Sequence, residues 1–141
     1  MSSKILVDEL AGKTAAGNIT VTSEGGSATM QLQQGIGKVW LCLNAEASTP
    51  AARDSFNISS ITDVTLAHYR PNYSSSMNST DYSTTGGASW ASPDGNYGSV
   101  VSFRSGSWFT SSSLDMRVFR TDNYTEVEAM EAMITIHGDL A

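Results

Sequence analysis

The sequence predicts an all-β fold: an antiparallel β-sandwich or jelly-roll-like domain with an extended, strand-rich N-terminal arm. Three observations predict it. Short apolar stretches alternate with polar residues at a period of two. Turn-forming glycine, serine, asparagine and proline separate these stretches. Charged residues make up only 16% of the chain, while the hydrophobic fraction is 40%. We divide the 141 residues into an arm, residues 1–35, and a sandwich domain, residues 36–141.

The arm contains three short apolar stretches. We expect strands at Ile5-Leu6-Val7, Ile19-Thr20-Val21 and Met30-Gln31-Leu32. Each stretch buries too little surface to offset the roughly 1–2 kcal/mol per residue of backbone ordering entropy. We therefore expect an attachment or oligomerisation arm, which neighbouring subunits or a larger assembly complete. Gln31 and Gln33 alternate with the apolar positions, so they are candidate subunit-interface residues.

The most apolar stretch of the chain runs from Lys38 to Asn44. Valine and leucine occupy one face of this expected strand, and Trp40 and Cys42 occupy the other. A strand with two apolar faces is buried on both sides, either inside the sandwich or at a subunit contact, so Trp40 and Cys42 are candidate subunit-interface residues. Cys42 is the only cysteine, so no disulfide can form within the chain. We expect it to act as a small buried hydrophobe rather than as a reactive thiol.

Two further strands are expected after this one. The first covers residues 54–58 and places Phe56 and Ile58 on one face. The second runs from Ile61 to Tyr69, and the segment Arg70-Pro71-Asn72 is expected to end it.

The second half of the sequence begins with a polar stretch. Serine, threonine and asparagine dominate Tyr73 to Gly87, which favours a long surface loop. The segment 92–96 predicts a turn, because its proline presets one backbone angle and its glycine tolerates positive φ. Alternation predicts strands near 101–104 and 114–119. Residues 130–136 contain helix-forming types, but their clean alternation predicts a strand.

Motifs that carry catalysis are missing from the sequence. We find no nucleophile elbow, phosphate-binding loop or dinucleotide fingerprint. His68 and His137 have no cysteine or carboxylate at ligand spacing, so we expect no metal site. Glu126 and Glu128 would share a strand face, and we interpret them as a solvated edge rather than as a glycosidase pair. We therefore expect neither enzymatic activity nor a cofactor.

The charge balance narrows the range of partners. Eight basic and 14 acidic residues give a net charge of −6, whereas nucleic-acid binding needs a basic patch. The same balance argues against docking on an anionic membrane surface. No stretch is long and apolar enough to span a membrane, and we expect no signal peptide. Because the sequence has no disulfide framework, we expect the chain to fold in a reducing cytoplasm.

Aromatic residues gather around the loops of the second half. The candidates for a receptor or interface site are Tyr82, Trp90, Tyr97, Trp108 and Phe109. Aromatic faces stack on sugar rings and anchor protein interfaces. The alternative is that these residues cover the ends of a small core, which is the commoner role of such side chains.

Several segments of the chain resemble a known class of proteins. The glycine-containing lead-in to Val39-Trp40 and the segment 53–63, RDSFNISSITD, resemble a module of uncharacterised virion proteins from marine tailed bacteriophages. The opening 4–8 and the ending 134–141 are similar to the corresponding parts of such proteins. The shared motifs contain no catalytic residue.

The resemblance implies a virion structural protein, either an oligomeric tail fibre or appendage or a capsid decoration protein. It also implies a homotrimer that contacts other virion proteins and is synthesised in the host cytoplasm. The alternative function is a glycan- or receptor-binding module at a fibre tip. Such a module would bind host surface glycan through the aromatic candidates.

Overall fold

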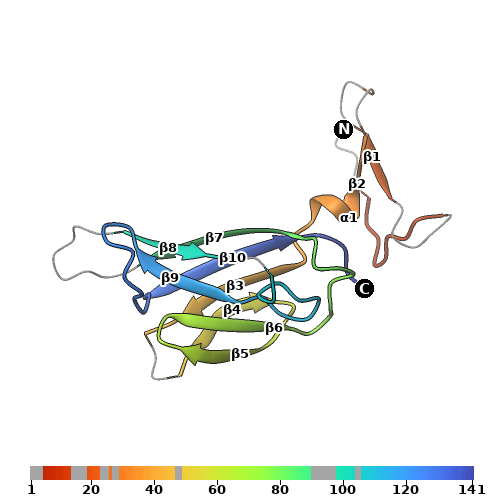
Figure 1. Cartoon of the computed structure of the whole chain (residues 1–141). Helices are drawn as coiled ribbons and strands as arrows, with labels where there is room; N and C mark the ends of the chain where they lie inside the picture. The colour runs from red at the N-terminus through yellow and green to blue at the C-terminus, as the bar shows by residue number, and fades with distance from the viewer. Residues whose placement is uncertain are drawn as a thin grey trace. The chain divides into compact units, whose positions relative to one another are not determined.

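The computed structural model describes residues 5–13, 19–22, 26, 29–46, 49–89, 98–103 and 106–141, and it is all-β, as the sequence predicts. These residues form ten strands and one short helix (Figure 1). The chain divides into two compact units, Met1–Ile36 and Gly37–Ala141.

The first unit contains a small antiparallel hairpin. Strand β1 (Thr20–Thr22) pairs with β2 (Thr29–Gln31), and the short helix α1 (Leu32–Gly35) follows. The strand expected at Ile5-Leu6-Val7 is wrong, because these residues belong to no strand and their side chains are exposed. Leu32 begins α1 rather than ending a strand. A three-residue stretch keeps strand geometry only when a neighbour pairs with its backbone, and the described residues supply none here.

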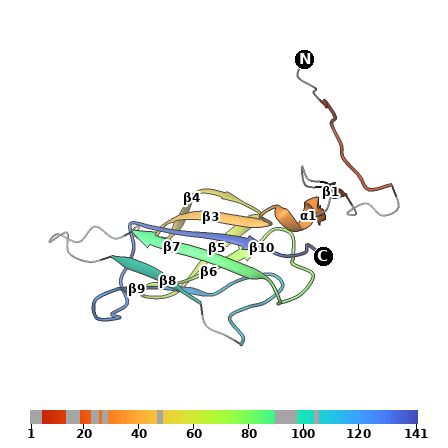
Figure 2. The same cartoon turned by 90° about the horizontal axis from the view of Figure 1, so that it is seen from above.

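The second unit is one eight-stranded antiparallel sheet with the order β4-β3-β10-β7-β8-β9-β6-β5 (Figures 1 and 2). Its strands are β3 (Val39–Asn44), β4 (Ala51–Phe56), β5 (Ile58–Thr65), β6 (His68–Tyr73), β7 (Ser83–Ser89), β8 (Ser99–Ser102), β9 (Met116–Arg120) and β10 (Glu131–His137).

This sheet curls until it is nearly a barrel. Among the described residues a single pair, Ala88 with Ser99, joins β7 to β8. The two edge strands of the sheet, β4 and β5, are consecutive in the chain and are joined by Asn57 alone. Two four-stranded halves therefore enclose one core but remain parts of a single sheet. The predicted sandwich or jelly roll is not established, because both need two separate sheets.

The core lies inside the curl and draws side chains from both halves. Leu41 and Leu43 of β3, Ile134 of β10, and Met116 and Val118 of β9 are at most 2% exposed. In each of these strands the buried residues alternate with more exposed ones, as the period-two pattern predicts. The choice of a strand rather than a helix for residues 130–136 is confirmed by β10.

The single strand expected at 54–58 is wrong, because Asn57 breaks it. Asn57 has a φ of 60°, in the left-handed region that asparagine tolerates better than most residues. Its side chain also bonds a distant segment: Oδ1 accepts from the Ser75 amide at 2.7 Å, and Nδ2 donates to the Ser75 carbonyl at 3.0 Å. Phe56 therefore ends β4, Ile58 begins β5, and the two do not share a strand face.

The single strand expected from Ile61 to Tyr69 is also wrong. The chain turns at Leu66 and Ala67, and β5 and β6 form an antiparallel hairpin. Ala67 has a φ of 56°, which the sequence does not signal, because glycine or asparagine usually takes that position. Pro71 does not end β6; it lies inside the strand, where the ladder to β9 covers only His68 and Tyr69.

The long surface loop expected from Tyr73 to Gly87 is wrong in its second half. Residues Ser83–Ser89 form β7, which pairs with β10 along its whole length. Gly86 faces inward, and a Cβ there would lie 3.0 Å from Cζ of Phe103. The glycine therefore serves close packing inside a strand rather than a turn. The turn predicted at 92–96 lies outside the described residues.

Three tyrosines in the core differ in how their hydroxyl groups are bonded. The Tyr82 hydroxyl accepts from Tyr73 at 3.2 Å and donates to the carbonyl oxygens of Thr110 and Ser113. The Tyr69 hydroxyl is buried and has no hydrogen-bond partner among the described residues. An unpaired buried hydroxyl destabilises a fold, whereas a paired one stabilises it.

We therefore expect opposite effects from two matched substitutions. Tyr69→Phe should raise the free energy of unfolding by up to about 1 kcal/mol, because it removes an unpaired polar atom. Tyr82→Phe should lower it by about 1–3 kcal/mol, because it leaves its hydrogen-bonding groups without a partner. Urea unfolding followed by circular dichroism measures both. Equal losses of stability would contradict the assignment of the two hydroxyl groups.

Candidate interaction face

The outer side of β4, β3, β10 and β7 carries an apolar surface. In β3 the buried valine and leucine residues point into the core, so Trp40 and Cys42 point outward. The same alternation places Met133 of β10 outward, since Ala132 and Ile134 are buried. We call this surface the outer face.

One half of the outer face is raised by two aromatic side chains. Trp40 of β3 lies directly opposite Phe56 of β4 in the strand register. Their side chains are large and remain 38% and 52% exposed. Directly opposed residues on one face of an antiparallel pair have Cβ atoms about 5 Å apart, so the two side chains are neighbours. We call this pair the aromatic ridge.

The other half of the outer face is low. Gly87 of β7 pairs with Met133 of β10, and Thr85 pairs with Thr135. These four residues belong to the lining of a hollow of about 330 Å³. A Cβ added to Gly87 would meet nothing within 4 Å, so this glycine opens directly to solvent. We call this region the glycine hollow.

Charged groups lie at the margin of the outer face rather than at its centre. Arg53 is an extra residue at the bulge in the β3–β4 pairing. Its guanidinium group lies 3.7 Å from the Glu131 carboxylate and donates to the Met130 carbonyl at 3.3 Å. Asp54 stands beside Cys42 in the register. The centre therefore offers apolar and hydroxyl groups to a partner, with charge at the edges.

The structure brings together half of the residues that the sequence predicts for a subunit interface. Trp40 and Cys42 lie on the outer face, whereas Gln31 and Gln33 belong to β2 and α1 of the first unit. Sequence reasoning missed Phe56, Met133 and Gly87. Only the pairing register places them beside Trp40 and Cys42, and no periodicity within one strand signals that register.

The aromatic candidates for a receptor site do not form one cluster. Tyr82 is buried in the core, and Phe109 packs against that core with its ring 5.4 Å from the ring of Tyr82. Trp108 is half-buried on the other half of the sheet. Trp90 and Tyr97 lie outside the described residues. Of the candidates that the structure describes, Tyr82 and Phe109 therefore cover the core.

Near Trp108, a buried carboxylate is held between two basic groups. The Asp115 side chain is 4% exposed and accepts two hydrogen bonds from Arg70, one of them from Nη2 to Oδ2 at 2.8 Å. Nε2 of His68 lies 3.4 Å from Oδ2 of Asp115. Burial alone would raise the pKa of Asp115, but the hydrogen bond and charge of Arg70, aided by His68, hold it below its usual value.

Aromatic and charged groups extend this network. The Trp108 ring stacks on His68 with 4.8 Å between ring centres, and the Arg117 guanidinium lies 5.3 Å from the Trp108 ring centre. Arg117 also forms an ion pair with Glu126. Because opposite charges compensate one another here, the network fastens the segment 108–115 to β6 and β9. The charges of Arg70 and Asp115, and those of Arg117 and Glu126, are paired with each other rather than directed at a substrate.

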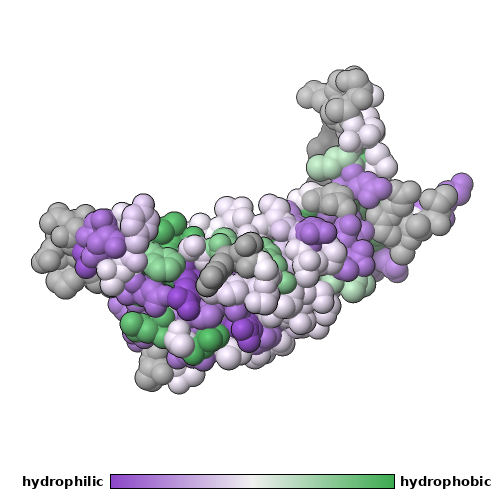
Figure 3. Space-filling view, viewed as in Figure 1, coloured by the Kyte–Doolittle hydropathy of each residue, from purple (hydrophilic) through white to green (hydrophobic). Residues whose placement is uncertain are grey.

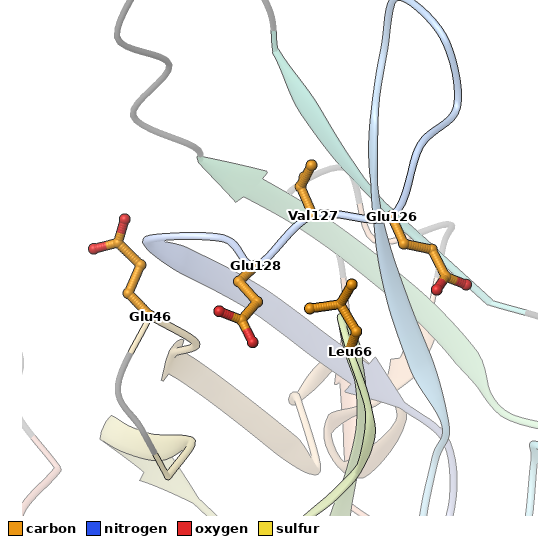
Figure 4. A pocket seen from close by; sticks show the side chains of 5 residues that line it. All are labelled: Glu46, Leu66, Glu126, Val127 and Glu128. Atoms are coloured by element: carbon orange, nitrogen blue, oxygen red, sulfur yellow. The ribbon is translucent and has the colours of Figure 1, made fainter.

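Three glutamates line an open hollow at the end of the second unit. Glu46, Glu126 and Glu128 surround it together with Leu66 and Val127 (Figure 4). In this view Leu66 lies between the carboxyl groups of Glu126 and Glu128, and Glu126 points away from the other two. Glu126 is already paired with Arg117. This geometry does not oppose two carboxyl groups across a bond, as glycosidase chemistry requires.

A second exposed apolar region lies on the half of the sheet away from Trp40. A hollow of about 430 Å³ beside β8 and β9 is lined by Val100, Val101, Ser102, Phe119 and Tyr124. Figure 3 shows apolar surface, in green, over this end of the sheet, while most of the described surface in that view is polar or neutral. The outer face differs from this region because it combines a raised and a hollowed half.

Within the described parts of the chain, no three histidine, cysteine, aspartate or glutamate side chains are grouped so that they could hold a metal ion. No helix among those residues is long and apolar enough to cross a membrane. Comparisons with models of protein families, with curated proteins and with solved structures find no match to this chain.

Proposed function

We propose that this chain is a non-catalytic structural subunit that associates with copies of itself in a bacteriophage virion, as part of a fibre, another appendage or the capsid decoration. One observation carries the self-association: Trp40, Phe56, Cys42 and Met133 face outward together from neighbouring strands. The assignment to a virion rests on the sequence resemblance described above, which also favours a trimer.

The composition of the outer face favours a protein partner. Exposed apolar surface rimmed by polar residues is typical of protein–protein interfaces, which are enriched in aromatic residues and methionine. The acidic net charge of −6 disfavours a nucleic-acid partner. A second copy of the chain also suits the charges at the margin, because Arg53 and Asp54 adjoin in β4 and can pair across a symmetric contact.

Glycan recognition, the alternative function, finds less support. Of the described aromatic candidates, Tyr82 and Phe109 are committed to the core, and Trp108 stacks on His68. A sugar site needs an aromatic face open to the ligand, with polar groups beside it that are free to bond. The carboxylate and guanidinium groups near Trp108 are instead paired with one another.

Trp40→Glu should convert the oligomer into a monomer. The substitution places a charge at the centre of the outer face, and truncating an interface tryptophan commonly costs about 2 kcal/mol or more. We therefore expect the dissociation constant to rise at least ~30-fold. Sedimentation equilibrium at micromolar concentration measures it.

The matched control is Val100→Glu, which adds the same charge at a similarly exposed apolar strand residue, in β8 on the other half of the sheet. It should leave the mass in solution unchanged. A wild-type chain that sediments as a monomer would contradict the self-association. Mass spectrometry of purified particles tests the virion assignment separately, and the copy number distinguishes a fibre from a decoration protein.

A further inference from the structure

Tyr124 has a backbone conformation that tyrosine rarely adopts. Its φ is 56°, in the left-handed region that glycine or asparagine enters at little cost. A bulky residue in that region is strained, and such strain is concentrated at functional sites. Tyr124 is 77% exposed and does not belong to the core. Packing in the core therefore does not explain why a tyrosine occupies this position.

The loop that carries Tyr124 is held by hydrogen bonds at its base. The Arg120 amide donates to the Thr125 carbonyl at 2.9 Å, which closes the loop. The amide and the hydroxyl group of Thr121 both donate to the Gly98 carbonyl, at 3.0 and 3.2 Å. Because these bonds already fix the loop, little conformational entropy is lost when Tyr124 contacts a ligand.

Tyr124 borders the hollow of about 430 Å³ beside β8 and β9. Val100 and Phe119 are directly opposed in the strand register, and both point outward, since the next pair, Val101 and Val118, is buried. The volume of the hollow lies within the range of about 300–1,000 Å³ that is typical of small-molecule sites. The hollow thus presents an apolar base with an exposed aromatic ring at its rim.

The charges near this hollow favour an uncharged ligand. Its described lining contains no charged residue. Arg120 and Asp122, which precede Tyr124 in the chain, bind each other through two hydrogen bonds of 3.0 and 2.8 Å. These two groups already compensate each other, so neither is directed at a phosphate, carboxylate or ammonium group of a ligand.

The groups that remain for hydrogen bonding to a ligand are hydroxyl and amide groups. Within the part of the chain that the structure describes, the hydroxyl groups of Ser102 and Tyr124 make no hydrogen bond. Asn123 accepts from the Thr125 amide through Oδ1 at 3.0 Å, and its Nδ2 group makes no hydrogen bond to the described residues. Hydroxyl and amide groups beside an exposed aromatic ring suit a sugar, whose apolar face stacks on the ring while its hydroxyl groups bond to the polar side chains.

We propose that Tyr124 and this hollow, here called the Tyr124 site, bind an uncharged sugar ring of a glycan. The sugar stacks on the Tyr124 ring, and Val100 and Phe119 contact its C–H groups. Tyr124 combines an open aromatic face with unbonded polar groups, which the aromatic residues singled out by the sequence do not. The Tyr124 site lies on β8, β9 and the loop after β9, so it adds a function to the structural role and does not depend on self-association.

Tyr124→Gly separates binding from stability. A glycan array of neutral and acidic oligosaccharides of glucose, galactose and N-acetylglucosamine selects the probe, and nuclear magnetic resonance titration of the full chain measures its dissociation constant. We expect a neutral probe to shift the amide resonances of residues 98–102 and 119–125. Tyr124→Gly should raise the dissociation constant at least about tenfold. Because glycine adopts a φ of 56° without strain, the same variant should not lower the midpoint of urea unfolding.

Two further variants test the roles of the ring and of the hollow. Tyr124→Phe keeps the aromatic ring and should raise the dissociation constant less than about threefold. Val100→Glu places a charge inside the hollow and should abolish sugar binding, while the mass of the protein in solution stays unchanged.

The opposite results would overturn the Tyr124 site. These are an array without a neutral binder, or binding that Tyr124→Gly leaves unchanged. A lower urea midpoint for Tyr124→Gly would also count against the site, because the tyrosine would then serve the fold. Sedimentation measures self-association separately, so failure of this site and failure of the proposed function are distinguishable.

Discussion

Asp115→Asn should lower the free energy of unfolding by about 2–4 kcal/mol. The amide keeps the volume of the carboxyl group but removes the negative charge that Arg70 and His68 share. Breaking a buried ion pair by removing one partner typically costs about 3–5 kcal/mol. Here the Arg70 side chain is 42% exposed and can turn to water, so we expect the lower part of that range. Urea unfolding measures the change.

The control for this substitution is Asp122→Asn. Asp122 binds Arg120 at 2.8 Å, but the Asp122 side chain is 30% exposed, against 4% for Asp115. Such pairs contribute less than about 1 kcal/mol, because water screens them. Similar losses for the two variants would show that burial of Asp115 does not decide the strength of its ion pair.

The effect of Asp115 should also depend on pH. Its native pKa lies below the ordinary value of 3.8, so the ionised carboxylate stabilises the fold at every pH above that value. The contribution declines as the pH falls below about 4 and passes through the lowered native pKa. The difference in stability between the wild-type protein and Asp115→Asn should therefore shrink in acid and stay constant from about pH 5 to 8.

The second large effect is alkaline unfolding. Burial, together with the charges of Glu128 and Asp63, raises the pKa of Tyr69 to about 12. Burial also raises the pKa of Tyr73, aided by its hydrogen bond to Tyr82, and that of Tyr82. In the unfolded chain these groups release their protons at about pH 10, and in the native state they release them only at a higher pH.

The sign of this linkage makes the fold less stable as the pH rises. Each tyrosine that is protonated only in the native state removes about 1.4 kcal/mol per pH unit above its unfolded pKa. Tyr69 alone removes about 3 kcal/mol by pH 12, and the raised pKa values of Tyr73 and Tyr82 add to this loss, while small domains are stable by only about 5–15 kcal/mol. We therefore expect cooperative unfolding between about pH 10 and 12.

Absorbance at the tyrosinate band and far-ultraviolet circular dichroism should change together in this transition. Tyr69→Phe should reduce the steepness of the loss, since it removes one of the buried tyrosines whose pKa is raised. Ionisation of the buried tyrosines well before the loss of β structure would contradict the assignment of their burial.

The parts of the fold that the sequence predicts are those whose signal lies within one strand. Alternation in β9 and β10 predicts both the strands and their buried faces, because one side of each must enter the core, whereas the β3 segment is predicted as a strand with two apolar faces. The failures occur where a single residue depends on distant atoms. Asn57 turns the chain because Ser75 binds its side chain, and Gly86 lies in a strand because Phe103 fills its space.

The same limit applies to the outer face. The sequence places Trp40 and Cys42 together on one face of their strand, but it predicts that both faces are buried, and the structure shows that this face points outward. Their neighbours are not predictable, since Phe56 and Met133 reach them only through the strand register. Register depends on the whole sheet, and a slip of one residue would turn each side chain to the other side.

The central position of β10 affects how the chain can acquire its structure during synthesis. Ile134 of β10 pairs with Leu41 of β3 on one side and with Gly86 of β7 on the other. Strand β3 therefore cannot form its pairing with β10 until the ribosome has synthesised the C-terminal part of the chain. Such distant pairing gives a high contact order, and domains of this kind fold in milliseconds to seconds. Until β10 emerges, the nascent chain exposes both apolar sides of β3. That interval is when chaperones would be expected to bind it, and a stall in translation before β10 would leave an aggregation-prone intermediate.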